Sequence, residues 1–301
     1  MSDLGNVSGF SNNESKLMGT KEFLESNSLV AKTAFLLLVV VVFVILLRIG
    51  ISFLTWVMSY STTPHLIDGM IDGKQMRVIE VDPNEKGSKP ITRSDDENDG
   101  IEFTWSVWLY VDDMDYKKGQ YRHIFHKGND NINLDSKPYG INFPNNAPGL
   151  YLAPDTNDLV VVMNTFDHIE EKITVKNYPL NKWFNVMIRA EGLDCDVYIN
   201  GTITNKHILK SVPKQNYDKV YMSLNGGFSG HTSNLWYWNY ALGTTEMQHI
   251  IDKGPNMTIL GDDMMQGKPR YFCYKYFKYN PSFFTKYRLS FYYWIRPDYS
   301  Y

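Results

Sequence analysis

Residues 101–111 read IEFTWSVWLYV, and this stretch decides the fold class. Successive side chains of a β-strand point to opposite faces, so every second residue here would share one face. The residues of that face are all apolar: Phe103, Trp105, Val107, Leu109 and Val111. We expect this face to pack on a core, and the opposite face, with Trp108 and Tyr110, to be covered as well. The stretch predicts a central strand of a β-structured domain.

Short strand-like runs, separated by turn residues, lie on both sides of this strand. They cover residues 76–81, 121–126, 159–164, 172–175, 183–189, 196–199, 202–209, 220–224 and 235–238. Asn200 and Gly201 stand between two of these runs, and this pair favours the positive φ angles that a type I′ hairpin turn needs. Many short strands with little helix between them indicate an all-β sandwich or jelly roll.

One helix is predicted near the end of these runs, at residues 244–253 (TTEMQHIIDK). The apolar residues of its inner face are Met247, Ile250 and Ile251. Thr244 or Thr245 is the expected N-terminal cap, and Gly254 follows the helix, in a position where glycine is common.

Three parts of the chain together resemble one known family. They are FTWSVWLYV (103–111), NKWFNVMIRAEG (181–192) followed by DVYINGT, and SNLWYWNYALGTTEMQHIIDKGP (233–255). Their order is similar to that in concanavalin A-like jelly rolls of the laminin-G type. In that family a tryptophan-led strand precedes a Tyr-x-Asn-Gly hairpin, and an aromatic strand runs into Ala-Leu and a short helix. The resemblance covers residues 101–279 and implies a jelly-roll sandwich.

A long apolar segment lies near the start of the chain. Residues 33–60 begin with fifteen uncharged residues (TAFLLLVVVVFVILL), and the apolar character resumes after Arg48. A bilayer core about 30 Å thick needs about 20 such residues, so we expect one transmembrane helix here. Arg48 has no acidic partner in the span, and its side chain would extend to the lipid interface. Lys32 at one end, and Trp56 and Tyr60 at the other, suit the two interfaces.

The rest of the chain divides by composition. Residues 1–32 are polar and lack apolar periodicity, which predicts a flexible tail. Residues 61–100 are predicted to form a linker with the first strand and an acidic loop, and residues 280–301 extend beyond the jelly roll at 101–279. The predicted fold is therefore an all-β, concanavalin A-like jelly-roll sandwich with one short helix, preceded by a single N-terminal transmembrane helix.

The whole arrangement also resembles membrane-tethered minor virion proteins of large DNA viruses that infect algae and protists. That resemblance implies a virion membrane as the location, with the C-terminal domain on the outer side. More basic residues precede the apolar segment than directly follow it, which also favours an N-terminus on the inner side.

The last segment, residues 280–301, is aromatic and basic. We expect it to dock on a partner protein or on the bilayer interface, where aromatic and arginine side chains dominate contacts. A closing strand of the sandwich is the alternative. The residues expected to bind the partner are Phe283, Phe284, Tyr287, Arg288, Phe291, Tyr293, Trp294 and Arg296.

Charge and cysteine content exclude two classes of protein. A net charge of -3 argues against a surface that binds nucleic acid generally, so no nucleic-acid partner is expected. The chain has only Cys195 and Cys273, which is no disulfide framework. Cys195 alternates with Val197 in a strand-like run, which indicates a small buried side chain. A bridge between the two cysteines is the alternative.

The sequence predicts no catalytic group. Glycosidases on related folds use paired carboxylates, and the nearest candidates here are Glu191, Asp194 and Asp196, which we expect to form a solvated hairpin edge. His123 and His126 lie three residues apart on a predicted strand and would face opposite sides, so they cannot chelate one ion unless the backbone bulges. We therefore expect a protein that is not an enzyme.

A calcium site is the one metal site that the residues suggest. Asn129, Asn131, Asn133 and Asp135 alternate in a loop and have the oxygen ligands that calcium prefers, although the loop lacks the glycine and glutamate of an EF-hand. Laminin-G-type domains often carry one calcium on a loop, so the resemblance implies such a site here. No other cofactor is expected.

These patterns predict a non-catalytic, membrane-anchored structural protein that links the internal membrane of a virion to its protein shell. Its partners would be the lipid bilayer and capsid proteins. The alternative is a surface-displayed carbohydrate-binding or adhesion module, with Trp236, Tyr237 and Trp238 as the aromatic platform for glycans. A divergent glycosidase is a third interpretation.

Overall fold

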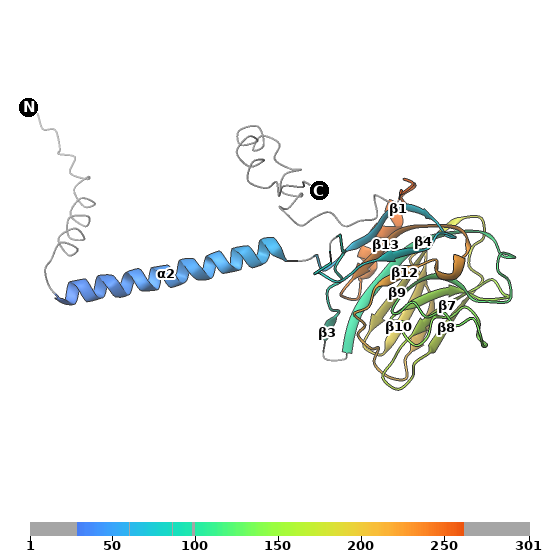
Figure 1. The fold of residues 1–301 in the computed structure, drawn as a ribbon, viewed down its shortest axis with the longest axis horizontal. Helices are drawn as coiled ribbons and strands as arrows, with labels where there is room; N and C mark the ends of the chain where they lie inside the picture. Colours follow the sequence, from blue (N-terminus) through green and yellow to red (C-terminus); the bar gives the residue numbers. More distant parts are fainter. Residues whose placement is uncertain (1–28, 60, 86, 98–99, 262–301) are drawn as a thin grey trace, which may run out of the picture. The chain divides into compact units, whose positions relative to one another are not determined.

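The computed structural model describes residues 29–59, 61–85, 87–97 and 100–261 (Figure 1). The described part of the chain divides into two units, one within residues 29–59 and the other within residues 61–261. Helix α2 is the described part of the first unit, and a β-sandwich is the described part of the second.

Helix α2 spans Leu29–Met58, so it begins four residues before the predicted start. With a mean hydropathy of 3.1, the helix is apolar enough to cross a membrane, and it is also long enough. A signal sequence near the N-terminus meets the same two criteria. Its 30 residues correspond to about 45 Å of helix, more than the bilayer core requires. Arg48 and Trp56 have exposed side chains, and Lys32 lies in the first turn, whereas Tyr60 lies outside the described residues.

The second unit is a sandwich of two antiparallel sheets, as predicted (Figure 1). Within the described residues, one sheet has the strand order β1-β13-β4-β9-β10-β11, with β3 beside β4, and the other has the order β2-β12-β5-β6-β7-β8. The strands of the first sheet are β1 (His65–Asp72), β3 (Asp95–Glu97), β4 (Gly100–Asp113), β9 (Trp183–Glu191), β10 (Asp194–Ile199), β11 (Thr202–Ile208) and β13 (Ser229–Trp238). The strands of the second sheet are β2 (Arg77–Ile79), β5 (Arg122–Lys127), β6 (Gly149–Leu152), β7 (Asp158–Met163), β8 (Glu171–Lys176) and β12 (Val220–Met222).

The core between the sheets is built around β4. All five residues of its predicted inner face are buried in one cluster with residues of the second sheet. Trp105 packs on Phe125 of β5, with ring centroids 5.4 Å apart, and so joins the two sheets. Cys195 is buried in the same cluster, which confirms its predicted packing role, and burial raises the pKa of its thiol to about 12. Cys273 lies outside the described residues.

Three strands are missing from the prediction. Strand β1 lies in the segment assigned to a linker, and a register shift in its pairing with β13 places the adjacent Leu66 and Ile67 both in the core, which hides the alternation. Strand β3 lies in the predicted acidic loop and pairs with the start of β4. Strand β6 is four residues long and buried throughout, so it has no alternating pattern to detect. The sandwich therefore begins at β1, well before residue 101.

The predicted hairpin turn and helix are confirmed. Asn200 and Gly201 have φ angles of 50° and 76°, the signs that a type I′ turn requires, between β10 and β11. Helix α3 spans Thr244–Lys253 as predicted, and Gly254 is its C-terminal cap. Its N-terminal cap is Gly243 rather than a threonine, and the Gly243 N–H donates a hydrogen bond to the Glu246 carboxylate at 3.1 Å. A short 3-10 helix, η1 (Leu224–Gly226), precedes β13.

The prediction that His123 and His126 face opposite sides is wrong. A register shift in the pairing of β5 with β6 turns both rings to one side, with His123 Nε2 2.7 Å from His126 Nδ1. The Leu224 N–H donates to His123 Nδ1 at 3.0 Å, so the proton of that ring is on Nε2 and points at His126. His126 Nε2 in turn lies 2.6 Å from the carbonyl oxygen of Asn129, to which it donates. Every ring nitrogen therefore has a partner while both rings are neutral.

Burial lowers the pKa of both histidines, that of His123 well below its ordinary value and that of His126 to about 4. The two neutral, buried histidines therefore stabilise the fold fully above the unfolded-state pKa of about 6.5. This stabilisation is lost as the pH falls below about 6.5, because the unfolded chain then binds two protons that the folded chain does not. We expect urea unfolding to show a loss of about 2 kcal/mol per histidine by pH 5. The variant H123Q/H126Q should reduce this pH dependence, whereas H249Q, at an exposed position, should not; an unchanged slope in the double variant would refute the assignment.

The turn between β10 and β11 offers a second test of the fold. Gly201 has φ of 76°, and a Cβ atom there would lie 3.3 Å from Cγ1 of Ile251 in α3. We expect G201V to lower the free energy of unfolding by about 1–3 kcal/mol, because valine is strained at positive φ. The neighbouring exposed substitution T202V should change it by less than about 0.5 kcal/mol. Equal stability of the two variants in thermal unfolding would argue against the type I′ turn.

Candidate functional site

An extra residue in β13 determines which of its aromatic side chains face outward. Ser233 pairs with Trp108 of β4 and Trp236 pairs with Ser106, so three steps along β13 match two along β4. Asn234 is part of this bulge and has a φ of 50°. After the bulge, Leu235 lies in the core, whereas Trp236 turns to the outer face of the sheet.

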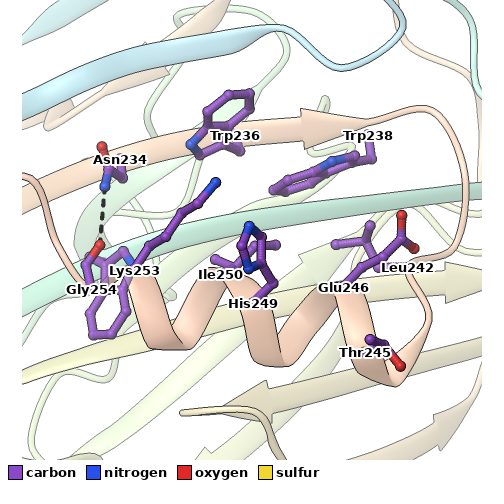
Figure 2. A pocket seen from close by; sticks show the side chains of 11 residues that line it. Asn234, Trp236, Trp238, Leu242, Thr245, Glu246, His249, Ile250, Lys253 and Gly254 are labelled. Atoms are coloured by element: carbon purple, nitrogen blue, oxygen red, sulfur yellow. Dashed lines mark hydrogen bonds between the residues drawn. The ribbon is translucent and has the colours of Figure 1, made fainter.

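Helix α3 packs on this outer face and leaves a cavity beside it. Met247 is buried against Met187, Trp238 and Leu242, and Ile250 and Ile251 pack at the edge of this cluster, as the predicted inner face of the helix requires. A cavity of about 500 Å³ lies between α3, β13 and β4 (Figure 2). It is lined by Trp108, Asn234, Trp236, Trp238, Leu242, Thr245, Glu246, His249, Ile250, Lys253 and Gly254. We call it the α3 cavity.

Three tryptophans form the sheet side of the α3 cavity. Trp236 and Trp238 lie with ring centroids 5.6 Å apart and planes inclined by 21°. His65 of β1 stacks on Trp236 at 3.8 Å, and burial lowers the pKa of His65 to about 4, so this ring is neutral at pH 7. Trp108 is only 6% exposed, which confirms that the outer face of β4 is covered at this position, whereas Tyr110 is half-buried. The three tryptophans therefore form an aromatic wall, in which His65 packs on Trp236.

Two buried polar atoms of residues that line this cavity have no hydrogen-bond partner among the described residues. They are the indole N–H of Trp108 and the side-chain oxygen of Asn234. The amide nitrogen of Asn234 donates to the carbonyl oxygen of Gly254 at 3.3 Å, which joins the end of α3 to the bulge. An unsatisfied buried donor costs about 1–3 kcal/mol, so the indole N–H of Trp108 would gain from pairing with a bound hydroxyl group. The side-chain oxygen of Asn234 points away from α3 (Figure 2).

The outer side of the cavity is polar. Glu246 accepts hydrogen bonds from the hydroxyl of Tyr240 at 3.1 Å and from the N–H of Gly243, whereas His249 and Lys253 are exposed on α3 (Figure 2). An apolar aromatic wall faces this polar rim. The arrangement suits a small molecule that has one apolar face and several hydroxyl groups.

The predicted glycan platform needs one correction. Trp236 and Trp238 line the cavity, but Tyr237 points into the core and is only 3% exposed. Its ring lies 5.0 Å from that of Trp105, and its hydroxyl donates to the carbonyl oxygen of Thr92 at 3.2 Å. Trp108 and Asn234 are absent from the predicted platform. The tryptophan pattern of β4 signals Trp108, but no sequence signal identifies Asn234.

The asparagine loop uses its side chains in local hydrogen bonds. The side-chain oxygen of Asn129 accepts from the amide of Asn142 at 2.8 Å. That of Asn133 accepts from the backbone N–H groups of Asp135 at 3.3 Å and Ser136 at 3.1 Å, and the carbonyl oxygen of Asn131 accepts from a backbone N–H. The described residues contain no group of three or more His, Cys, Asp or Glu side chains that could hold a metal ion. The calcium site stays a prediction.

The acidic residues near β10 are held in ion pairs. Asp194 pairs with Lys206 at 3.1 Å, and Glu191 pairs with Arg189 at 2.6 Å. Asp196 is buried rather than solvated as predicted, and burial raises its pKa. The residues predicted to bind a partner, from position 283 to position 296, lie outside the described residues.

No protein-family model matches this chain, and no curated protein matches it in sequence. Among solved structures it is similar to the ligand-binding domain of botulinum neurotoxin serotype D in complex with N-acetylneuraminic acid, at 9% identity and a TM-score of 0.44, over 65% of this chain and 51% of that one. The binding domain of botulinum neurotoxin serotype G is similar at 13% identity and a TM-score of 0.41, over 64% of this chain and 50% of that one. The chain thus spans about half the length of these domains. Its assignment as a β-sandwich rests on the strand pairing described above.

Proposed function

We propose that this chain is a non-catalytic, membrane-anchored carbohydrate-binding protein, and that the α3 cavity holds the saccharide. The observation that carries the proposal is an aromatic wall on the sheet that faces polar side chains of α3 in one cavity (Figure 2). A pyranose has an apolar face of C–H groups and a rim of hydroxyl groups. The C–H face would stack on Trp236 and Trp238, and the hydroxyl groups would pair with the Trp108 N–H and with the polar side chains of α3 that line the cavity.

The proposal that the protein is not an enzyme is supported by the state of its candidate groups. Asp194 and Glu191 are held in ion pairs with basic side chains. His123 and His126 are buried and hydrogen-bonded to each other. The α3 cavity contains Glu246, but both of its oxygens already accept hydrogen bonds. These groups therefore favour binding over hydrolysis.

We further propose that α2 spans a membrane and displays the sandwich at its surface. The apolar length of Leu29–Val57 supports this. A link between a virion membrane and its protein shell depends on residues 280–301, which lie outside the described residues. The described part of the chain thus favours the carbohydrate-binding alternative over the capsid-linking one, and the virion location stays a prediction.

The carbohydrate-binding proposal is tested with the full chain in detergent micelles on a printed glycan array, followed by calorimetric titration of the glycans that bind. We expect W236A to weaken binding at least tenfold, or about 1.4 kcal/mol, because it removes the more exposed of the two stacked indole rings.

The control is Y217A, which removes an aromatic side chain that is 73% exposed and does not line the α3 cavity. This variant should bind like the unmodified chain, and thermal unfolding should show that both variants are folded. The proposal fails if no glycan binds, or if a folded W236A binds as tightly as the control.

A further inference from the structure

The α3 cavity carries opposite charges at its two ends. Glu246 lies in the first turn of α3 and Lys253 is the last residue of the helix, and both line the cavity. They are seven residues apart, which corresponds to about 10 Å along a helix, the scale of one or two sugar rings. Figure 2 shows Lys253 extending from α3 toward the side of the cavity where Trp236 lies. A ligand in the cavity would therefore experience a different charge at each end.

The two charges differ in how they are used by the protein. Both oxygens of Glu246 accept hydrogen bonds, from Tyr240 and from Gly243. Lys253 makes no ion pair or hydrogen bond with any described residue. At the cavity, the ammonium group of Lys253 is therefore the charged group whose donors pair with no described residue.

We propose that the saccharide is a carboxylated sugar whose carboxylate pairs with the ammonium group of Lys253; this inference rests on the proposed function. An ammonium group is a compact charge with three donors, and its hydrogen bonds to a carboxylate are charge-assisted. The sugar ring lies on Trp236 and Trp238, with its carboxylate at the C-terminal end of α3.

The C-terminal end of a helix disfavours an anion, because its last carbonyl groups point outward. At the C-terminal end of α3, one carbonyl group of the helix and that of the following glycine already accept hydrogen bonds. Ile251 O accepts from the Gly254 N–H at 3.0 Å, and Gly254 O accepts from Asn234 Nδ2 at 3.3 Å. These hydrogen bonds reduce the negative potential of the helix end at the carboxylate. The positive charge of Lys253 outweighs the remaining negative potential.

The test uses pairs of sugars that differ by one carboxylate. Calorimetric titration of the full chain in detergent at pH 7 would compare the methyl glycosides of glucose and glucuronic acid, galactose and galacturonic acid, and mannose and mannuronic acid, together with the methyl glycoside of N-acetylneuraminic acid and its methyl ester. We expect the acid of at least one pair to bind at least tenfold more tightly than its neutral partner. Raising the salt concentration from 20 mM to 500 mM should reduce this preference, because the rim of the cavity is open to solvent.

Variants of Lys253 assign the preference to this residue. K253Q should abolish the difference between acid and neutral partner, K253R should keep most of it, and K176Q, at an exposed lysine on β8 outside the cavity, should leave it unchanged. Equal binding of the partners in every pair would overturn this inference and leave the carbohydrate-binding proposal standing. A preference that survives in K253Q would also overturn it. Failure of every one of these sugars to bind would overturn this inference, whereas the carbohydrate-binding proposal falls only if no glycan on the array binds.

Discussion

The α3 cavity depends on one extra residue in β13. The bulge at Asn234 inverts the order in which side chains alternate along the strand, so that Trp236 faces outward and Tyr237 enters the core. The same asparagine donates a hydrogen bond to Gly254, the residue that ends α3. The bulge therefore both forms the aromatic wall and fixes the helix that faces it. A strand without it would present leucine and tyrosine to the helix.

The binding wall and the hydrophobic core are two faces of the same strands. On the inner face, Tyr237 packs on Trp105, which reaches the second sheet through Phe125. On the outer face, Trp108 lies among the residues of the cavity. A side chain on a strand that is packed from both sides loses little freedom when a ligand binds. The proposed site is thus held by the core rather than by loops.

Much of this architecture could be predicted from the sequence because local rules determine it. Alternation identified β4 and most other strands, and the Asn200–Gly201 pair identified the turn that follows β10. The rest could not be predicted because a bulge leaves no mark in composition. Bulges hide β1, bring His123 beside His126, and place Tyr237 in the core. The cavity also depends on how α3 packs against the sheet, which is a tertiary contact that no local pattern encodes.

The direct test of the central claim is the nuclear magnetic resonance spectrum of the indole N–H groups, of which the chain has seven. The signal of Trp108 can be assigned from its loss in W108F. A saturating saccharide should shift the signals of Trp108, Trp236 and Trp238, and that of Trp108 should move downfield as its N–H gains an acceptor, while the signal of Trp183 stays in place. A saccharide that binds and leaves the three cavity signals unshifted would contradict the account.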